Sequence, residues 1–259
     1  MTHKEILLEI KGPVAVIRLN RAAKRNALND SLILGLRELF EKELPPTGVR
    51  AAMLDGAGDH FCAGLDLSEL RERDAGQGLH HSRMWHAALE QVQYGPVPVV
   101  AALHGAVVGG GLELASACHI RVADESAFYA LPEGSRGIYV GGGGAVRIPR
   151  LIGAARMTDM MLTGRVYDAQ EGERVGFAQY LVPQGQASAK AMELAIRVAE
   201  NAPLTNYALM HALPRIAEQP ADQGFFTEAM MAAIAQSAPE AKERVQAFLD
   251  GRAAKVQKA

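Results

Sequence analysis

The sequence contains few of the residues that mark the more specialised classes of protein. It has only two cysteines, Cys62 and Cys118, in 259 residues, so a disulfide scaffold is not expected and a reducing compartment, the cytoplasm, is predicted. The net charge of −2 creates no strong field, so neither nucleic acid nor a membrane surface is an expected partner. The hydrophobic share of 49% is enough to form a substantial core.

Charged residues are absent from one long stretch, Gln91 to Leu112, which has the length of a membrane span. However, Pro96, Pro98 and His104 interrupt it, and its apolar part, VPVVAAL, is short. The stretch therefore predicts a buried strand followed by a turn. The opening segment MTHKEILLEIKG is too charged for a secretory signal.

Strands and helices alternate in the predicted first part of the chain, and helices dominate the last part. EILLEI and VAVIRLN are expected to pair around a turn at Gly12, and Asn29 or Asp30 to cap the helix in SLILGLRELFEKEL. A strand, a glycine turn and a helix follow one another twice, at 49–70 and 97–118, which suggests stacked β-β-α turns. Helical patterns then occupy 155–163, 186–200, 203–217, 222–236 and 239–250.

The segment GAVVGGGLELASAC, residues 105–118, places three consecutive glycines shortly before Glu113 in an apolar run. The N–H groups at a helix start have no partner within the helix and carry partial positive charge, and glycine lets a ligand approach them. The segment CAGLD has the same character. Together the two could donate two N–H groups to one carbonyl oxygen and form an oxyanion hole. The alternative is a tight glycine turn that only allows close packing.

Glu133 lies in the segment ALPEGSRGIYVGGGGAVRIPRLIG, between a proline and a dense run of glycines. Two short strands separate it from Glu113, so the two carboxylates could face each other over a cleft. Because two close carboxylates do not both ionise easily, one would keep a proton near neutral pH, which supplies a general acid and a general base. The alternative is two unrelated surface glutamates among 29 acidic residues.

Other catalytic chemistry leaves no signature in the sequence. There is no P-loop, no G-x-G-x-x-G that follows a strand and opens a helix, and no G-x-S-x-G elbow. His80, His81 and His86 lack the spacing of a zinc site and are predicted to lie on a solvated helix face, so no metal is expected. Cys62 is either a nucleophile or, as its apolar neighbour favours, a small buried filler.

Five segments follow one another in a characteristic order: NRAAKRNAL, FCAGLDLSEL, AALHGAVVGGGLELASACHIRVAD, LPEGSRGIYVGGGGAVRIPRLIG and LTGRVYDAQEGERVGFAQYLV. With them the chain resembles the crotonase superfamily, the enoyl-CoA hydratase/isomerase group, over nearly its whole length. The resemblance implies an α/β fold in which a spiral of β-β-α turns, residues 1–195, forms the catalytic core. It also implies a helical C-terminal region, 196–259, that builds a homotrimer or a dimer of trimers.

The resemblance further implies an acyl-CoA thioester substrate and no metal or redox cofactor, since coenzyme A enters as part of the substrate. The N–H groups of Leu65 and Gly110 would form the oxyanion hole, with Glu133 as the acid and Glu113 as the base. The remaining roles fall into three groups: Lys24, Arg25 and Ala27 near the CoA nucleotide; Ala63, Asp66 and Leu67 along the pantetheine; and segment 70–90, with Met84 and Trp85, as the wall of the acyl pocket.

The chain departs from the family pattern at three positions. Ala22 replaces the usual proline of N-R-P, Val140 stands in the proline position of I-P-G, and Arg244 replaces a common glycine. The second change puts Tyr139 near the expected site, where its hydroxyl could touch the substrate.

Hydration of a 2-enoyl-CoA is the predicted reaction. The alternatives within the fold are a double-bond isomerase, a hydratase-lyase, or a hydratase for an aryl or thioether acyl group. Isomerases often need only the later glutamate, so the presence of Glu113 argues against that reaction. An alternative of another class is a binding protein that has kept the fold and lost catalysis.

Overall fold

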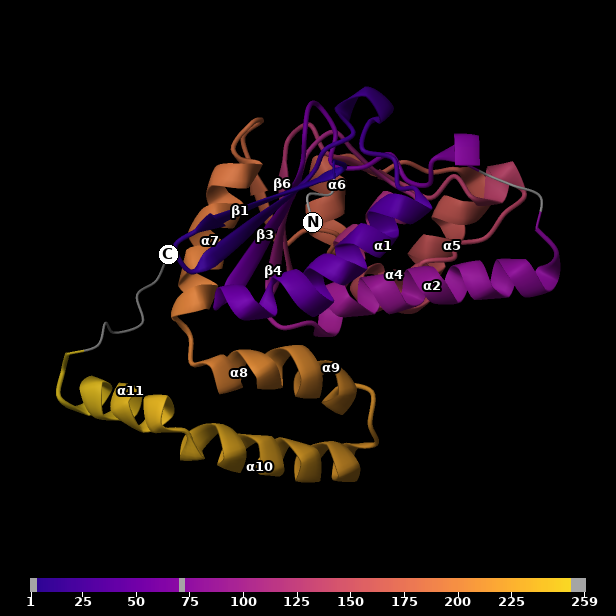
Figure 1. Cartoon of the computed structure of the whole chain (residues 1–259). Helices are drawn as coiled ribbons and strands as arrows, with labels where there is room; N and C mark the ends of the chain where they lie inside the picture. Colours follow the sequence, from indigo (N-terminus) through magenta and orange to yellow (C-terminus); the bar gives the residue numbers. More distant parts are fainter. Residues whose placement is uncertain (1–3, 70–72, 253–259) are drawn as a thin grey trace. The chain divides into compact units, whose positions relative to one another are not determined.

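The described part of the chain, residues 4–69 and 73–252 of this computed structural model, forms two compact units that divide between Ala199 and Glu200. The first unit mixes strands and helices, and the second is helical over its described residues (Figure 1), which confirms the α/β class. The division at 195 and 196 into a catalytic and an oligomerisation region stays a prediction. Residues 70–72 of the predicted acyl-pocket wall lie outside the described residues.

A six-stranded sheet with the order β1-β2-β3-β4-β6-β8 forms the centre of the first unit. The strands are β1 (Ile6–Lys11), β2 (Val14–Leu19), β3 (Ala51–Gly56), β4 (Val99–Leu103), β6 (Ile120–Asp124) and β8 (Tyr180–Val182). As predicted, β1 and β2 pair antiparallel on either side of Gly12, and every other neighbouring pair is parallel. All residues of β3 and β4 are buried, which explains why both strands are apolar runs.

Helices cover both faces of this sheet (Figure 1). On one face, α7 (Ala187–Glu200) shares a core cluster with Val14 and Val16 of β2. Ala15 and Ile17 of the same strand belong to the larger core on the other face, with α1 (Asp30–Glu38) and α2 (Ala75–Tyr94). The alternation follows from the two-residue period of a strand. At the start of α1, the Asn29 side chain accepts a hydrogen bond from the N–H of Leu32, so Asn29 is the cap.

Short strand pairings beside the large sheet join each strand–turn–helix segment of the chain to the next one. Leu28 pairs with Leu65, Cys62 with Val107, β5 (Ala106–Val108) with β7 (Phe128–Ala130), and Tyr129 with Tyr167. Because these pairings occur in chain order, successive strand–turn–helix passages stack on one another, as the β-β-α spiral predicts. The stacking places the glycine turn at Gly64 against the one at Gly109, just before α3 (Gly110–Ala117).

Four elements were not expected from the sequence, namely β5, β8, α4 (Gly144–Ile152) and α6 (Ala169–Val175). The helical pattern of α4 is hidden because the helix begins in a run of glycines and contains Pro149. The helix predicted over 203–217 is confirmed as a continuous helical segment, residues 203–216, with a π-helical turn in its middle, just before Pro214, which has no N–H to donate. That segment consists of α8 (Pro203–Tyr207), a π-helical turn at Ala208–Ala212, and α9 (Leu213–Ile216).

The other predicted helices of the C-terminal half are confirmed as α5 (Ala154–Thr163), α10 (Ala221–Ser237) and α11 (Pro239–Leu249). Short 3-10 helices occupy Ala22–Lys24, Pro45–Thr47, Leu67–Glu69 and Gly134–Arg136, and a π-helical turn, Leu39–Glu43, follows α1. Within the described ranges, no helix has both the length and the apolarity needed to cross a bilayer. The uncharged stretch from Gln91 to Leu112 contains the end of α2, then β4, β5 and the start of α3.

Candidate active site

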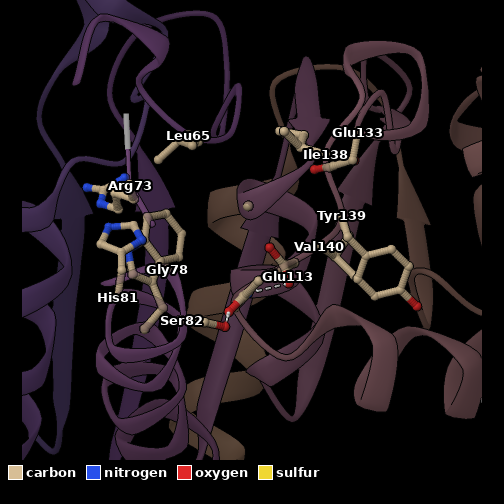
Figure 2. A pocket seen from close by; sticks show the side chains of 14 residues that line it. Leu65, Arg73, Gly78, His81, Ser82, Glu113, Glu133, Ile138, Tyr139 and Val140 are labelled. Atoms are coloured by element: carbon tan, nitrogen blue, oxygen red, sulfur yellow. Dashed lines mark hydrogen bonds between the residues drawn. The ribbon is translucent and has the colours of Figure 1, made fainter. Parts of the chain in front are cut away.

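A cavity of about 430 Å³ opens between α2 and the chain that follows β7 (Figure 2). All four residues predicted to be catalytic line it, namely Leu65, Gly110, Glu113 and Glu133, as do Trp85 and Tyr139. The volume lies in the range of small-molecule sites. The stacked turns of the spiral therefore bring together residues that lie far apart in the sequence.

Two glycine turns meet at this cavity. Gly64 has φ +95° and Gly109 has φ +52°, both in the left-handed half of backbone space, where glycine is favoured. A side-chain carbon added at Gly64 would lie 2.8 Å from the carbonyl oxygen of Val108 and 3.4 Å from the nitrogen of Gly110. The absence of a side chain at residue 64 is thus what lets the two turns touch.

Each turn presents a backbone N–H that the fold does not use. Leu28 pairs with Leu65 through the carbonyl of Gly64 and the N–H of Asp66, so the N–H of Leu65 itself points to the other side. Gly110 is the first residue of α3, where an N–H has no partner in the helix. Among the described residues, no hydrogen bond takes up either N–H. The two groups are free to donate to one oxygen atom.

Glu113 projects from the first turn of α3 and is only 3% exposed. Its Oε1 accepts hydrogen bonds from the N–H groups of Gly142 and Gly144, both at 2.7 Å. Burial raises the pKa of this carboxyl, while the two N–H donors and the positive charge of Arg147 act in the opposite direction. The carboxylate is therefore held in one orientation and receives support for its ionised form.

Glu133 enters the cavity from the chain after β7 and is 7% exposed. Its Oε2 is buried and has no hydrogen-bond partner among the described residues. Burial raises the pKa of this carboxyl, and the negative charge of Glu113 raises it further. Burial thus raises the pKa of both carboxyls, but their surroundings differ: two N–H groups and Arg147 oppose the rise at Glu113, whereas the charge of Glu113 adds to the rise at Glu133.

The residues predicted to contact CoA lie beside this cavity rather than in its lining. The N–H of Ala63 donates to the carbonyl of Arg25 at 3.0 Å, and the thiol of Cys62 donates to the carbonyl of Asn26 at 3.1 Å. These bonds join the loop of Lys24, Arg25 and Ala27 to the turn of Ala63, Asp66 and Leu67; Lys24, Arg25 and Leu67 are exposed. Burial raises the pKa of the Cys62 thiol to about 12, which favours the buried filler over the nucleophile.

Asp66 is buried, and its carboxylate is engaged within the protein. It accepts hydrogen bonds from the hydroxyl of Ser68 at 2.6 Å, from the N–H of Ser68 at 3.1 Å and from the guanidinium of Arg21 at 2.9 Å. The Ser68 hydroxyl contributes most to lowering the pKa of Asp66 from 3.8 to about 2. These bonds hold the turn that presents Leu65.

Asp66→Asn is expected to lower the free energy of unfolding by about 2 kcal/mol at neutral pH, the equivalent of the pKa shift. Because the folded-state pKa is depressed, the stabilisation is present above about pH 4 and is lost as the pH falls through about 2. Urea unfolding of the wild type and the variant near pH 7 and pH 3 measures the loss in the free energy of unfolding at each pH. Asp59→Asn, at an exposed carboxylate, is the control. An equal loss in both variants would contradict the assignment.

Two further polar residues, His81 and Arg147, lie where the sequence did not lead us to expect them. The prediction that His81 lies on a solvated face was wrong: it lines the cavity, and its Nε2 donates to Asp30 Oδ1 at 2.7 Å. Trp85, which the family resemblance had placed in the wall of the acyl pocket, lies one helical turn along α2 from His81, is buried and lines the same cavity. Arg147 of α4 is also buried and donates to Gln93 Oε1 at 2.6 Å and to the Gly142 carbonyl at 3.0 Å.

Tyr139 lines the cavity; the residue is 69% exposed, and its ring is turned away from Glu113 in Figure 2. Within the described ranges, no group of three His, Cys, Asp or Glu side chains is placed to hold a metal ion. The polar groups that converge on the cavity are therefore two carboxyls, two backbone N–H groups and the side chains of α2. Such a set can donate to a carbonyl oxygen and can move protons on either side of the atoms beside it.

The model of the enoyl-CoA hydratase/isomerase family matches residues 9–258 of the chain. Enoyl-CoA hydratase EchA19 of Mycobacterium tuberculosis is 31% identical over 252 residues, which cover 96% of this chain and 95% of that protein. The 2,3-dehydroadipyl-CoA hydratase of Escherichia coli is also 31% identical, over 250 residues that cover 96% of each chain.

Solved structures share the fold. A protein of Rhodopseudomonas palustris, provisionally described as an enoyl-CoA hydratase, is 60% identical with a TM-score of 0.93 over 97% of each chain. The enoyl-CoA hydratase of Bacillus anthracis is 33% identical with a TM-score of 0.89, over 96% of this chain and 97% of that one. The crotonase-type spiral expected from the sequence is thereby confirmed. The chain belongs to the enoyl-CoA hydratase/isomerase family of the crotonase superfamily.

Proposed function

We propose that the protein is an enoyl-CoA hydratase that adds water in the syn sense across the 2,3 double bond of an enoyl-CoA thioester. The observation that carries this proposal is the lining of one cavity by two buried carboxyls and by two N–H groups for which the described residues provide no acceptor. Family membership supports an acyl-CoA substrate. It also limits the expected reactions to those of the hydratase/isomerase family. The proposed chemistry needs no metal or redox group.

In this mechanism the thioester oxygen lies between the N–H groups of Leu65 and Gly110. As water adds to the β-carbon, the electrons of the double bond move towards that oxygen, and the two N–H groups stabilise the enolate-like charge. Removing one such donor typically costs about 10²–10³-fold in kcat. The dipole at the start of α3 acts in the same direction.

Glu113 and Glu133 divide the proton transfers. The ionised carboxylate of Glu113, held by two N–H groups, accepts a proton from the attacking water as the new C–O bond forms. The protonated carboxyl of Glu133 gives its proton to the α-carbon, and the enolate electrons form that C–H bond. Because the two groups interact, the pH dependence of the rate reports pKa values of the pair.

Arg147→Met is expected to shift the acid limb of the pH profile of kcat/KM to higher pH. The arginine charge lowers the pKa of Glu113, so its loss raises that pKa, and the base then becomes ionised only at higher pH. Arg147→Lys, which keeps the charge, should leave the limb near its original position. Arg150→Met, at an exposed arginine of the same helix, is the matched control. An unmoved limb in a folded Arg147→Met protein would contradict the role of this charge.

A screen of acyl-CoA esters in isotopically labelled water, read by mass spectrometry, tests the reaction type. Hydration adds the mass of one labelled water to an enoyl-CoA. A shifted double bond without a gain in mass would instead indicate an isomerase, and cleavage of the carbon chain after hydration would indicate a hydratase-lyase. Binding of CoA esters without any turnover would indicate a protein that has lost catalysis.

Assembly into a homotrimer or a dimer of trimers also belongs to this proposal. Its support is the set of large apolar side chains that the second unit exposes, with Phe225 and Phe226 of α10 both 70% exposed and Leu249 of α11 71% exposed. Exposed apolar surface of this kind marks interaction sites. Location in the cytoplasm is likewise proposed, from the two free, buried cysteines, Cys62 and Cys118.

A further inference from the structure

The wall of the cavity formed by α2 and the residue before its cap carries polar side chains. Arg73, His81 and Ser82 lie on this wall, opposite Ile138 and Val140 (Figure 2). An acyl pocket that holds only a hydrocarbon chain has no use for an arginine, because burying an unpaired charge is costly. The side chain of Arg73 is 26% exposed, so it is largely removed from solvent.

The carboxylate nearest to Arg73 is occupied by another residue. Asp30 Oδ1 accepts from His81 Nε2 at 2.7 Å, whereas Asp30 Oδ2 forms only a long ion pair with Arg73 Nη2, at 3.8 Å and beyond hydrogen-bond distance. Asp30 is also 43% exposed, so water screens its attraction for the guanidinium. Among the described residues, no hydrogen bond takes up the N–H donors of Arg73. Its planar guanidinium therefore retains the geometry for a second carboxylate.

The rest of the cavity points to the same chemistry. Ser82 directs its hydroxyl at the carbonyl of Gly141 at 2.6 Å, so that hydrogen is already used. The indole N–H of Trp85 is buried without a partner among the described residues, and Trp85 lines the same cavity. The unused groups on this side are donors, and a carboxylate, which only accepts, is the acyl substituent that suits them. Ile138 and Val140 provide an apolar wall for the methylene groups before it.

We propose that the preferred acyl group carries a carboxylate on its chain, and that Arg73 binds this carboxylate while His81 keeps Asp30 from forming a hydrogen bond with the guanidinium. This inference rests on the proposed hydratase function, since it names the acyl class that the same cavity receives. Arg73 is then a specificity-determining residue, and His81 is a positioning residue that acts through Asp30. The catalytic carboxyls Glu113 and Glu133 remain separate from this group, because Figure 2 shows Arg73 and His81 across the cavity from Glu133.

The test compares ω-carboxy-2-enoyl-CoA esters of increasing chain length with matched methyl-terminated esters. The wild-type protein is expected to show at least a tenfold higher kcat/KM for one carboxylated ester than for its methyl-terminated match. Arg73→Met should reduce this preference ratio by about 10–100-fold, the size of a lost charge-assisted hydrogen bond. Arg73→Lys should restore part of it, and Arg83→Met, at an exposed arginine within α2, should leave it unchanged.

Variants at the neighbouring pair give effects of opposite sign. Asp30→Asn removes the competing carboxylate and is expected to raise the preference ratio. His81→Leu frees Asp30 for Arg73 and is expected to lower it. A lower ratio in the Asp30→Asn variant would overturn the proposed competition. A preference of the wild type for methyl-terminated or aryl esters would overturn the assignment of a carboxylated acyl group. A change in Arg73→Met no larger than in Arg83→Met would overturn the role of Arg73.

Binding of saturated acyl-CoA esters separates this inference from the reaction itself. Calorimetry with a saturated ω-carboxyacyl-CoA and its methyl-terminated match requires no turnover. If the carboxylated ester binds more tightly in the wild type but not in Arg73→Met, the acyl assignment stands even if hydration fails. If enoyl-CoA esters are hydrated without any preference in rate or binding, the acyl assignment fails and the hydratase function stands.

Discussion

Glutamine in place of Glu133 is expected to lower kcat for hydration by about 10²–10⁴-fold, the usual contribution of a general acid. The amide cannot give the α-carbon the proton that the carboxyl supplies. The fold should tolerate the change, because Oε2 of Glu133 has no partner among the described residues and the amide is uncharged, as the protonated carboxyl is. Steady-state kinetics with an enoyl-CoA, together with the thermal unfolding temperature, measures both effects.

The same loss is expected for Glu113→Gln. The carbonyl oxygen of the glutamine can still accept the N–H groups of Gly142 and Gly144, so the turn should keep its structure while the base is lost. The double variant should be little slower than the worse single variant, because the two groups serve one reaction step. The single variants Glu113→Gln and Glu133→Gln should each bind a saturated acyl-CoA with a Kd within a few-fold of that of the wild type.

Glu125→Gln, at an exposed glutamate between the two in sequence, is the matched control and should retain full activity. Wild-type turnover in either Glu113→Gln or Glu133→Gln would refute a scheme that needs both carboxyls. Loss of turnover together with loss of acyl-CoA binding would point to a role in holding the substrate instead.

Removing the N–H of Leu65 is the second large effect, with an expected loss of about 10²–10³-fold in kcat. Incorporation of leucic acid, the hydroxy acid with the leucine side chain, replaces this N–H with an ester oxygen. The change is selective because no hydrogen bond among the described residues uses the group, although the Gly64 carbonyl, which accepts from Leu28 at 2.7 Å, becomes a weaker acceptor. KM should change less than kcat, since the donor acts mainly in the transition state.

Lactic acid in place of Ala57 is the control for the ester itself. It removes an N–H that donates to the carbonyl of Leu19 at 2.8 Å, away from the cavity. This variant should lose some stability and keep its kcat. If the two esters lower kcat equally, the effect at residue 65 is structural and the oxyanion role of Leu65 is wrong.

Local patterns in the sequence were sufficient for the elements that depend on neighbouring residues. The β1–β2 hairpin and the cap at Asn29 follow from alternation, turn residues and a capping side chain within a few positions. The convergence of the turns at Gly64 and Gly109 followed from their shared glycine pattern together with the family resemblance. The hairpin and the cap are each encoded within a short window, whereas the meeting of the two glycine turns could not have been predicted without the resemblance.

Contacts between distant segments were beyond such reasoning. Arg147 reaches Gln93 across 54 positions, and His81 reaches Asp30 across 51. No periodicity in the sequence reports a pairing over such a distance, since it arises only when the helices pack. The polar wall of the cavity and the charge that supports Glu113 therefore became visible only in three dimensions.

Half of the proposed catalytic constellation consists of main-chain amides, and this has a consequence for any survey of the protein by mutagenesis. Every substitution at Leu65 except proline retains the amide hydrogen, so alanine scanning would classify this position as dispensable. Sensitivity would appear at Gly64 instead, where a new methyl group would meet the carbonyl oxygen of Val108 at 2.8 Å. In a mutational scan, sensitivity at position 64 would therefore report on the catalytic N–H group of the next residue, Leu65.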